Sequence, residues 1–187
     1  MGKAIVLAAA LMAGACAGGP QPFVPDTARL PQGALGSGFD SDTTAVYLAQ
    51  WAFASRGRTQ GRPIEGARAA ASMDYIAGQI YTSPRWSNVS ALTKEQLLRG
   101  RVEVRTALGV VPGTSSQAVV DSLTTAGNAL AAGDEAAAVA QLGAPVFDQP
   151  GEQVLLRLAN LPYMQMANVS TMRAANELFD SSTRNYR

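Results

Sequence analysis

Apolar residues recur along most of the chain at the three- and four-residue spacing of an amphipathic α-helix. In the segment 63–81 these residues form one face, made of Ala69, Met73, Ile76 and Ile80. Further helices are predicted within four segments and as a hairpin in a fifth: 43–57, 87–109, 152–161, 163–179 and 115–143. No alternating strand pattern competes with them, so the sequence predicts an all-α fold, a compact bundle of about seven short helices.

Capping residues give the expected helix ends. Asp42 or Thr43 can cap the first helix, and Gly57 is expected to end it. Pro63 suits the first turn of the second helix, and Thr93 is a plausible cap for the third.

Large side chains mark the expected faces of the first and last helices. Tyr47 and Trp51 lie four residues apart on the first helix, beside a neighbouring apolar strip. On the last helix, Met172, Ala175 and Phe179 share a face.

The segment 115–143 is expected to form two helices around a tight turn at residues 133–134. It resembles a tetratricopeptide repeat in a short set of residues: Gly127, Asn128, Ala129, Gly133, Asp134 and Ala138. The two glycines stand six residues apart, where that family has seven, and the chain has no second copy. A stable stack needs about three copies, so a single hairpin within the bundle is the expected arrangement.

The N-terminus has the layout of a secretory signal peptide. Lys3 precedes an apolar run of nine residues, 4–12, and small residues follow at 13–15. The run is too short to span a bilayer, which takes ~20 residues. Cys16, the only cysteine of the chain, comes directly after it.

Residues 13–16, AGAC, resemble the lipobox of bacterial lipoprotein precursors, with Ala13 where leucine is usual. The resemblance implies that 1–15 is a signal peptide and that Cys16 carries acyl chains that anchor the protein to a membrane. Ordinary secretory cleavage at the same bond would instead leave a free thiol with no second cysteine to pair with. Ala17 and Gly18 lack the Asp-type retention signal of that family, which implies the outer membrane, on its periplasmic side.

Residues 16–42 are rich in Gly, Pro, Ser and Asp and are predicted to form a flexible tether. Alternatively, this segment could pack on the folded part through Phe23, Val24 and Leu30. Residues 43–187 are expected to form a single helical domain, long enough to bury a core.

The composition excludes several classes of catalytic and metal-binding site. The chain has no histidine, which excludes Ser-His-Asp and Cys-His catalysis and histidine metal sites. With Cys16 acylated no thiolate remains, and Ser90 precedes Lys94 by four residues rather than the three of S-x-x-K. Removal of Lys3 with the signal leaves 14 basic against 14 acidic residues, so no basic excess indicates a nucleic-acid partner.

Carboxylate chemistry stays open, but Glu65, Asp74, Glu95 and Glu103 are scattered on helix positions expected to be exposed. No pair stands out at the spacing that glycan hydrolysis needs. The sequence therefore predicts no catalytic residues, no cofactor and no metal site.

Asp40, Asp42 and Thr44 are similar to a calcium loop and to the phosphate-transferring motif of haloacid-dehalogenase-like enzymes. Ala45 and Trp51 stand where the calcium loop needs Gly and Glu, and no apolar strand precedes the motif. Helix capping by Asp42 is the favoured interpretation.

Four arginines, Arg56, Arg58, Arg62 and Arg68, cluster with only Glu65 against them. One interpretation is a solvated loop and helix start. The other is a contact with an anionic surface, where each arginine would contribute about 1 kcal/mol.

Together these features predict an envelope-anchored lipoprotein that acts as a non-catalytic interaction or assembly module, with another envelope protein as its partner. The alternative is a periplasmic binding module for a lipid, a glycan or a small apolar ligand. The residues that could line its pocket are aromatic or contain sulfur: Tyr75, Tyr81, Trp86, Tyr163, Met164 and Met166.

Overall fold

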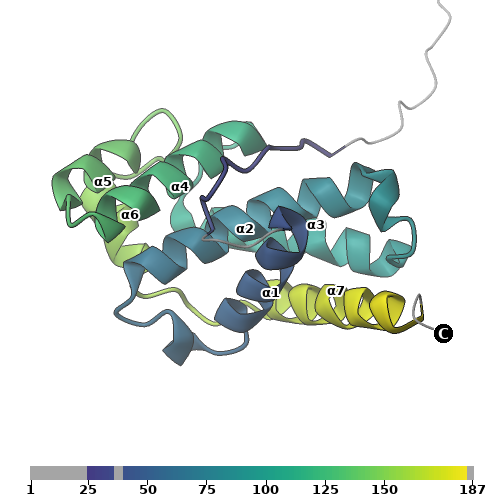
Figure 1. The fold of residues 1–187 in the computed structure, drawn as a ribbon. Coiled ribbons are helices and arrows are strands. Elements are labelled where there is room, and N and C mark those ends of the chain that lie inside the picture. Colours follow the sequence, from purple (N-terminus) through teal and green to yellow (C-terminus); the bar gives the residue numbers. More distant parts are fainter. Residues whose placement is uncertain (1–24, 36–39, 185–187) are drawn as a thin grey trace, which may run out of the picture.

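The computed structural model of the protein describes residues 25–35 and 40–184. This part of the chain contains seven α-helices and two short 3-10 helices and forms a compact bundle, which confirms the predicted all-α fold (Figure 1). The α-helices are α1 (Ser41–Phe53), α2 (Pro63–Thr82), α3 (Ala91–Leu108), α4 (Ser116–Ala131), α5 (Glu135–Gln141), α6 (Gly151–Leu158) and α7 (Gln165–Arg184). The 3-10 helices are η1 (Arg56–Arg58) and η2 (Pro84–Trp86).

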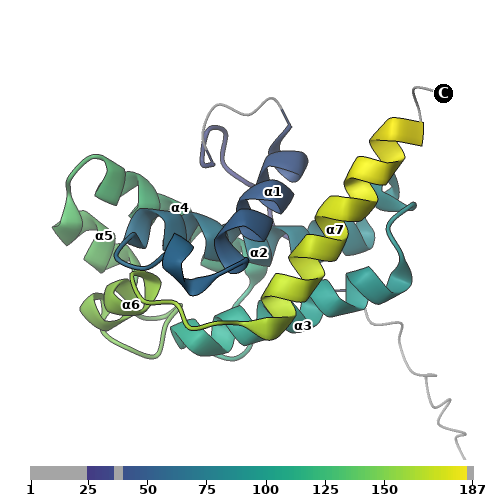
Figure 2. The same cartoon turned by 90° about the horizontal axis from the view of Figure 1, so that it is seen from below.

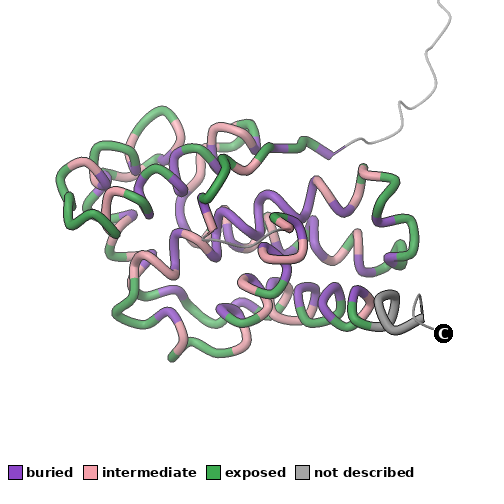
Figure 3. Tube along the Cα trace, in the orientation of Figure 1, coloured by how far each residue is buried: buried purple, intermediate pink, exposed green. Residues whose placement is uncertain are grey.

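Helix α2 is the centre of the bundle and packs against α1, α3, α4 and α6. Thirteen of its 20 residues are buried, and Figure 3 shows it buried along most of its length. The predicted apolar face of this helix is confirmed, because Ala69, Met73, Ile76 and Ile80 are all fully or almost fully buried. Its many alanines let several neighbouring helices approach closely.

Helices α3 and α7 pack together and cap each other, and α7 also contacts α1 (Figure 2). Ser90, rather than the predicted Thr93, is the N-cap of α3. Glu177 of α7 accepts hydrogen bonds from the Ser90 backbone N–H at 2.7 Å and from the Thr93 hydroxyl at 2.7 Å. A residue from another helix thus supplies the carboxylate that the local sequence lacks in a capping box.

The reverse contact is made by Glu103 of α3. Its carboxylate accepts the backbone N–H groups of Met166 and Ala167 at 2.8 and 2.9 Å, at the start of α7. Between the two caps lies Gly100, where an added Cβ would stand only 3.1 Å from Ala167 Cα. This glycine has low helix propensity, and its missing side chain allows α3 to lie close to α7.

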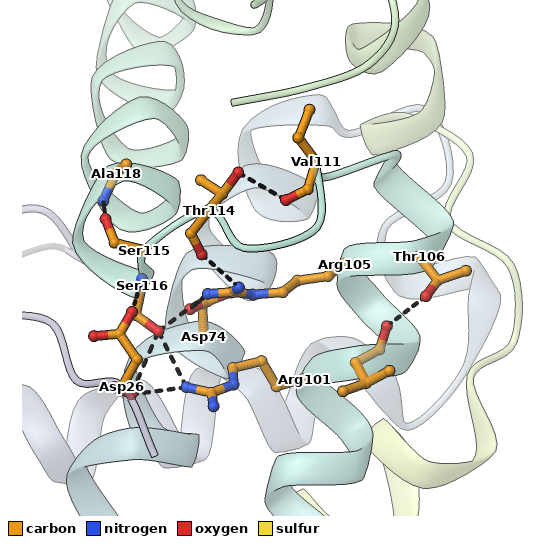
Figure 4. A network of polar contacts seen from close by, with 11 residues as sticks. Asp26, Asp74, Arg101, Arg105, Thr106, Val111, Thr114, Ser115, Ser116 and Ala118 are labelled. Carbon is orange, nitrogen blue, oxygen red and sulfur yellow. Dashed lines mark hydrogen bonds and ion pairs between the residues drawn. The ribbon is translucent and has the colours of Figure 1, made fainter. Parts of the chain in front are cut away.

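A buried ion pair links α2, α3 and the start of α4 (Figure 4). Asp74, in the middle of α2, is 2% exposed, although the sequence places it on an exposed position. Arg105 of α3 binds it through two parallel hydrogen bonds of 2.6 and 2.7 Å. The same guanidinium donates to the Thr114 carbonyl and the Ser116 hydroxyl. Arg105 therefore connects α3 to α2 and to the start of α4.

Residues 25–35 lie on the bundle rather than apart from it, whereas the sequence places them in the tether 16–42 and starts the domain at residue 43. The Asp26 carboxylate accepts the Ser116 backbone N–H, and the Asp26 carbonyl accepts from Arg101 at 2.8 Å. Ala28 is buried, and Gly78 of α2 leaves room for the segment, since an added Cβ would stand 3.0 Å from Thr27 Cα.

Helix α1 differs from its sequence-based prediction at both ends. Asp40, rather than Asp42 or Thr43, caps it, and it ends at Phe53 instead of Gly57. Its buried face contains the small and aliphatic residues, including Val46, while Tyr47 and Trp51 are 42% and 37% exposed. These two large aromatic side chains therefore lie outside the core.

On α7, Ala175 is buried, whereas Met172 and Phe179, which the sequence analysis places on the same face, are exposed. The buried face instead carries small residues together with one leucine, because α1 and α3 pack closely on this helix: Ala167, Ser170, Thr171, Ala174 and Leu178.

The predicted hairpin is confirmed as α4 and α5, with Asp134 as the N-cap of α5. No helix in the described ranges is long and apolar enough to cross a membrane.

We expect Asp74→Asn to lower the free energy of unfolding by ~2–3 kcal/mol, because the partly buried Arg105 would lose its counter-charge. Urea unfolding followed by circular dichroism measures this change. Asp121→Asn, at an exposed position of α4, is the matched control and should change stability by no more than ~0.5 kcal/mol. Equal unfolding midpoints for Asp74→Asn and the wild type would contradict the role of the ion pair.

Candidate functional site

A cleft of about 240 Å³ lies between α1 and α2. Its lining residues are Leu48 and Trp51 from α1 and Glu65 and Arg68 from α2. The first two give it an apolar wall, and the other two give it a charged wall. The cleft therefore has the chemistry to receive an amphipathic group.

The indole of Trp51 is held in place by η1. The Arg58 guanidinium carbon lies 5.5 Å from the centre of the Trp51 ring, and Arg58 Nη1 donates to the Trp51 carbonyl at 2.9 Å. This cation–π contact and hydrogen bond place a positive charge beside the apolar wall of the cleft.

Arg68 has unused hydrogen-bonding capacity. Its Nε is buried and has no hydrogen-bond partner among the described residues, and the same is true of Ser72 Oγ, four residues later on α2. Residues four apart share a helix face, so both atoms belong to the same side of α2. Buried polar atoms nearly always have a partner, and leaving one without costs ~1–3 kcal/mol. A ligand cannot reach this buried Nε in the structure, but the terminal nitrogens of Arg68, which lines the cleft, are available to an acceptor.

The four arginines grouped from the sequence separate in the structure. Arg58 and Arg68 flank or line the cleft, whereas Arg62 is exposed just before α2. Arg56 lines a different depression of only about 10 Å³, together with Tyr163 and Met164. That volume holds at most one water, so these last two residues form no ligand pocket there.

The sequence analysis missed the cleft because it placed Tyr47 and Trp51 on one helix but named neither of them as a binding residue. The signal that identifies the true buried face is the spacing of Ala45, Ala49 and Ala52, all buried. Small residues at such spacing let α1 approach its neighbours and leave the larger aromatics outside.

The motif Asp40-x-Asp42 lies at the opposite end of α1 from the cleft. Asp40 accepts hydrogen bonds from the Asp42 and Thr43 backbone N–H groups. The motif therefore caps a helix, as predicted, but the capping residue is Asp40 and not Asp42. Asp42 is 7% exposed and accepts from the Tyr75 hydroxyl, from Trp86 Nε1 at 3.1 Å and from Arg85 at 3.3 Å.

This arrangement shifts two pKa values. The hydrogen bond from Arg85 lowers the pKa of Asp40 to about 2. Burial, and then the hydrogen bond to Asp42, raises the pKa of Tyr75 well above its usual range. Tyr75 and Trp86 are predicted pocket residues, but both are buried and bound to one carboxylate. Their role is to fix the start of α1 against α2 and η2.

The remaining carboxylates named from the sequence have structural partners or lie apart. Glu103 caps α7, Glu95 accepts from the Tyr81 hydroxyl at 3.2 Å, and Asp74 pairs with Arg105. In the part of the chain that the structure describes, no group of three or more potential ligands is placed to hold a metal ion.

Cys16 and the preceding signal segment lie outside the described residues. Comparisons with protein-family models, with curated proteins and with solved structures found no match. The lipoprotein and tetratricopeptide resemblances therefore stay predictions from the sequence.

We expect the Asp40–Arg85 contact to make stability depend on pH at the acid end. The pKa of Asp40 is lowered from its ordinary value of 3.8 to about 2, so its contribution is fully present above pH 3.8 and is lost as the pH falls toward 2. Asp40→Asn should flatten the stability profile between pH 5 and 2, as measured by thermal unfolding. An unchanged slope in this variant would contradict the assignment.

Proposed function

We propose that this protein is an envelope-anchored bacterial lipoprotein that acts as a non-catalytic interaction module at the membrane surface. The cleft between α1 and α2 is the main observation in favour of an interaction role. It combines Trp51 with Arg58 and Arg68, and Trp and Arg are residue types that carry much of the binding energy in protein interfaces.

The anchor is proposed from the sequence around Cys16. Eight residues separate Cys16 from Pro25, where the described segment begins. A chain of that length reaches at most ~30 Å, whatever its conformation. Because residues 25–35 dock on the bundle, acyl chains on Cys16 would hold the domain close to the membrane.

A binding module for a small ligand is the second candidate. The cleft supports it less well, because about 240 Å³ is below the ~300–1,000 Å³ of sites that enclose such ligands. A space of this size suits one side chain of a larger partner. A carboxylate enzyme has less support still, since Asp74 and Glu103 serve as an ion-pair partner and a helix cap.

We expect Cys16→Ser to remove the protein from the membrane fraction. Intact-mass spectrometry should find acyl groups on the wild type and none on the variant, because serine has no thiol to receive them. Ala13→Leu, which introduces the usual lipobox residue, is the matched control and should stay acylated. A wild type without acyl mass, or a variant that remains in the membrane pellet, would overturn the lipoprotein proposal.

A further inference from the structure

We propose that the cleft between α1 and α2 receives one apolar side chain from an acidic segment of a partner protein, with a carboxylate of that segment paired to Arg68. The inference rests on the proposed function, since it gives the partner of the interaction module a defined chemistry. The occupant is thus a short peptide segment in which an aromatic or aliphatic residue is flanked by Asp or Glu.

The size of the cleft and its apolar wall suit a single apolar side chain. The cleft of about 240 Å³ accommodates a single large side chain, and burial of that side chain against Leu48 and Trp51 would remove apolar surface of both residues from water. Tyr47 lies one helical turn before Trp51 and is 42% exposed, which extends this apolar surface beyond the cleft.

Arg68 supplies the positive charge that a carboxylate of the partner would pair with. Arg68 lines the cleft, and no hydrogen bond or ion pair with another described residue occupies its guanidinium, so its terminal nitrogens can meet an acceptor from a partner. A carboxylate suits the planar guanidinium because it accepts two parallel hydrogen bonds, as Asp74 does from Arg105 in this same protein. Arg58 adds a second positive charge beside the Trp51 ring.

Among the described residues that line the cleft, Glu65 is the acidic one. It opposes an added carboxylate, but two arginines outweigh it, and its own oxygens can accept backbone N–H groups of a bound peptide. A peptide supplies such donors, whereas a lipid tail does not. Inserting hydrocarbon here would also strip water from Arg58 and Arg68 without giving either an acceptor.

The test is a nuclear magnetic resonance titration of the full chain carrying Cys16→Ser, so that no acyl chain competes for the cleft. The chain has two tryptophans, which give two indole N–H signals. Trp51 lines the cleft, and Trp86, which is buried against Asp42, is the internal control. The probes are three blocked tetrapeptides: Asp-Asp-Phe-Asp, Asp-Asp-Ala-Asp and Lys-Lys-Phe-Lys.

We expect Asp-Asp-Phe-Asp to shift the Trp51 signal saturably and to leave the Trp86 signal in place. The alanine and lysine peptides should each bind at least ~5-fold more weakly, because one lacks the apolar group and the other the carboxylates. Equal affinity for all three peptides, or no saturable shift of Trp51, would overturn the proposal.

Substitutions connect the binding to Arg68. Arg68→Gln should weaken binding of Asp-Asp-Phe-Asp by ~10-fold, since a charge-assisted pair is lost. Arg99→Gln, at an exposed position of α3, is the matched control and should bind as the parent chain does. If Arg68→Gln disturbs the Trp86 signal, Arg68→Lys replaces it; lysine keeps the charge but lacks the planar fork, and unchanged affinity there would count against the proposal.

Vesicles of phosphatidylglycerol distinguish a peptide from a lipid surface. A Trp51 shift produced by vesicles and by none of the peptides would overturn the proposal in favour of a membrane contact. Because the titrated chain carries no acyl group, failure here would leave the lipoprotein assignment intact. Failure of the acylation experiment would likewise leave the peptide result intact.

Discussion

The fold depends on a carboxylate that has to be neutralised in its interior. Asp74 sits in the middle of α2, the helix that four others surround, and Arg105 is its ion-pair partner. The guanidinium of Arg105 also satisfies the backbone and side chain at the start of α4, where Asp26 docks the N-terminal segment. One buried pair thus sets the relative positions of α2, α3, α4 and residues 25–35.

The cleft is a consequence of how α1 is held against this centre. At its N-terminal end Asp42 is bound by Tyr75 and Trp86, which draws α1 onto α2. At its C-terminal end Asn168 of α7 donates to the Phe53 carbonyl at 3.0 Å, and η1 folds over Trp51. Fixed at both ends, α1 leaves Leu48 and Trp51 facing Glu65 and Arg68 across the cleft.

Periodicity predicts the helices and the buried face of α2, because burial there follows the apolar pattern. It fails on α1 and α7, where the closest packing uses alanine, serine and threonine and leaves larger residues such as Trp51 and Phe179 outside. The cap of α3 shows a further limit. Glu177, which completes it, is 87 residues from Ser90 in the chain, so no local motif contains it. The cleft likewise joins residues of two helices whose faces the sequence does not orient.

We propose that an acyl anchor at Cys16 and a short connection hold the bundle at a membrane, where the cleft binds a partner protein. The most direct test is site-specific photo-crosslinking in cells, with the crosslinking residue at position 47, beside the cleft, or at position 102, exposed on α3. We expect one discrete protein adduct from position 47, with an acidic segment at the crosslink, and loss of that adduct with Arg68→Gln. Equal adducts from both positions, or an adduct unaffected by Arg68→Gln, would contradict it.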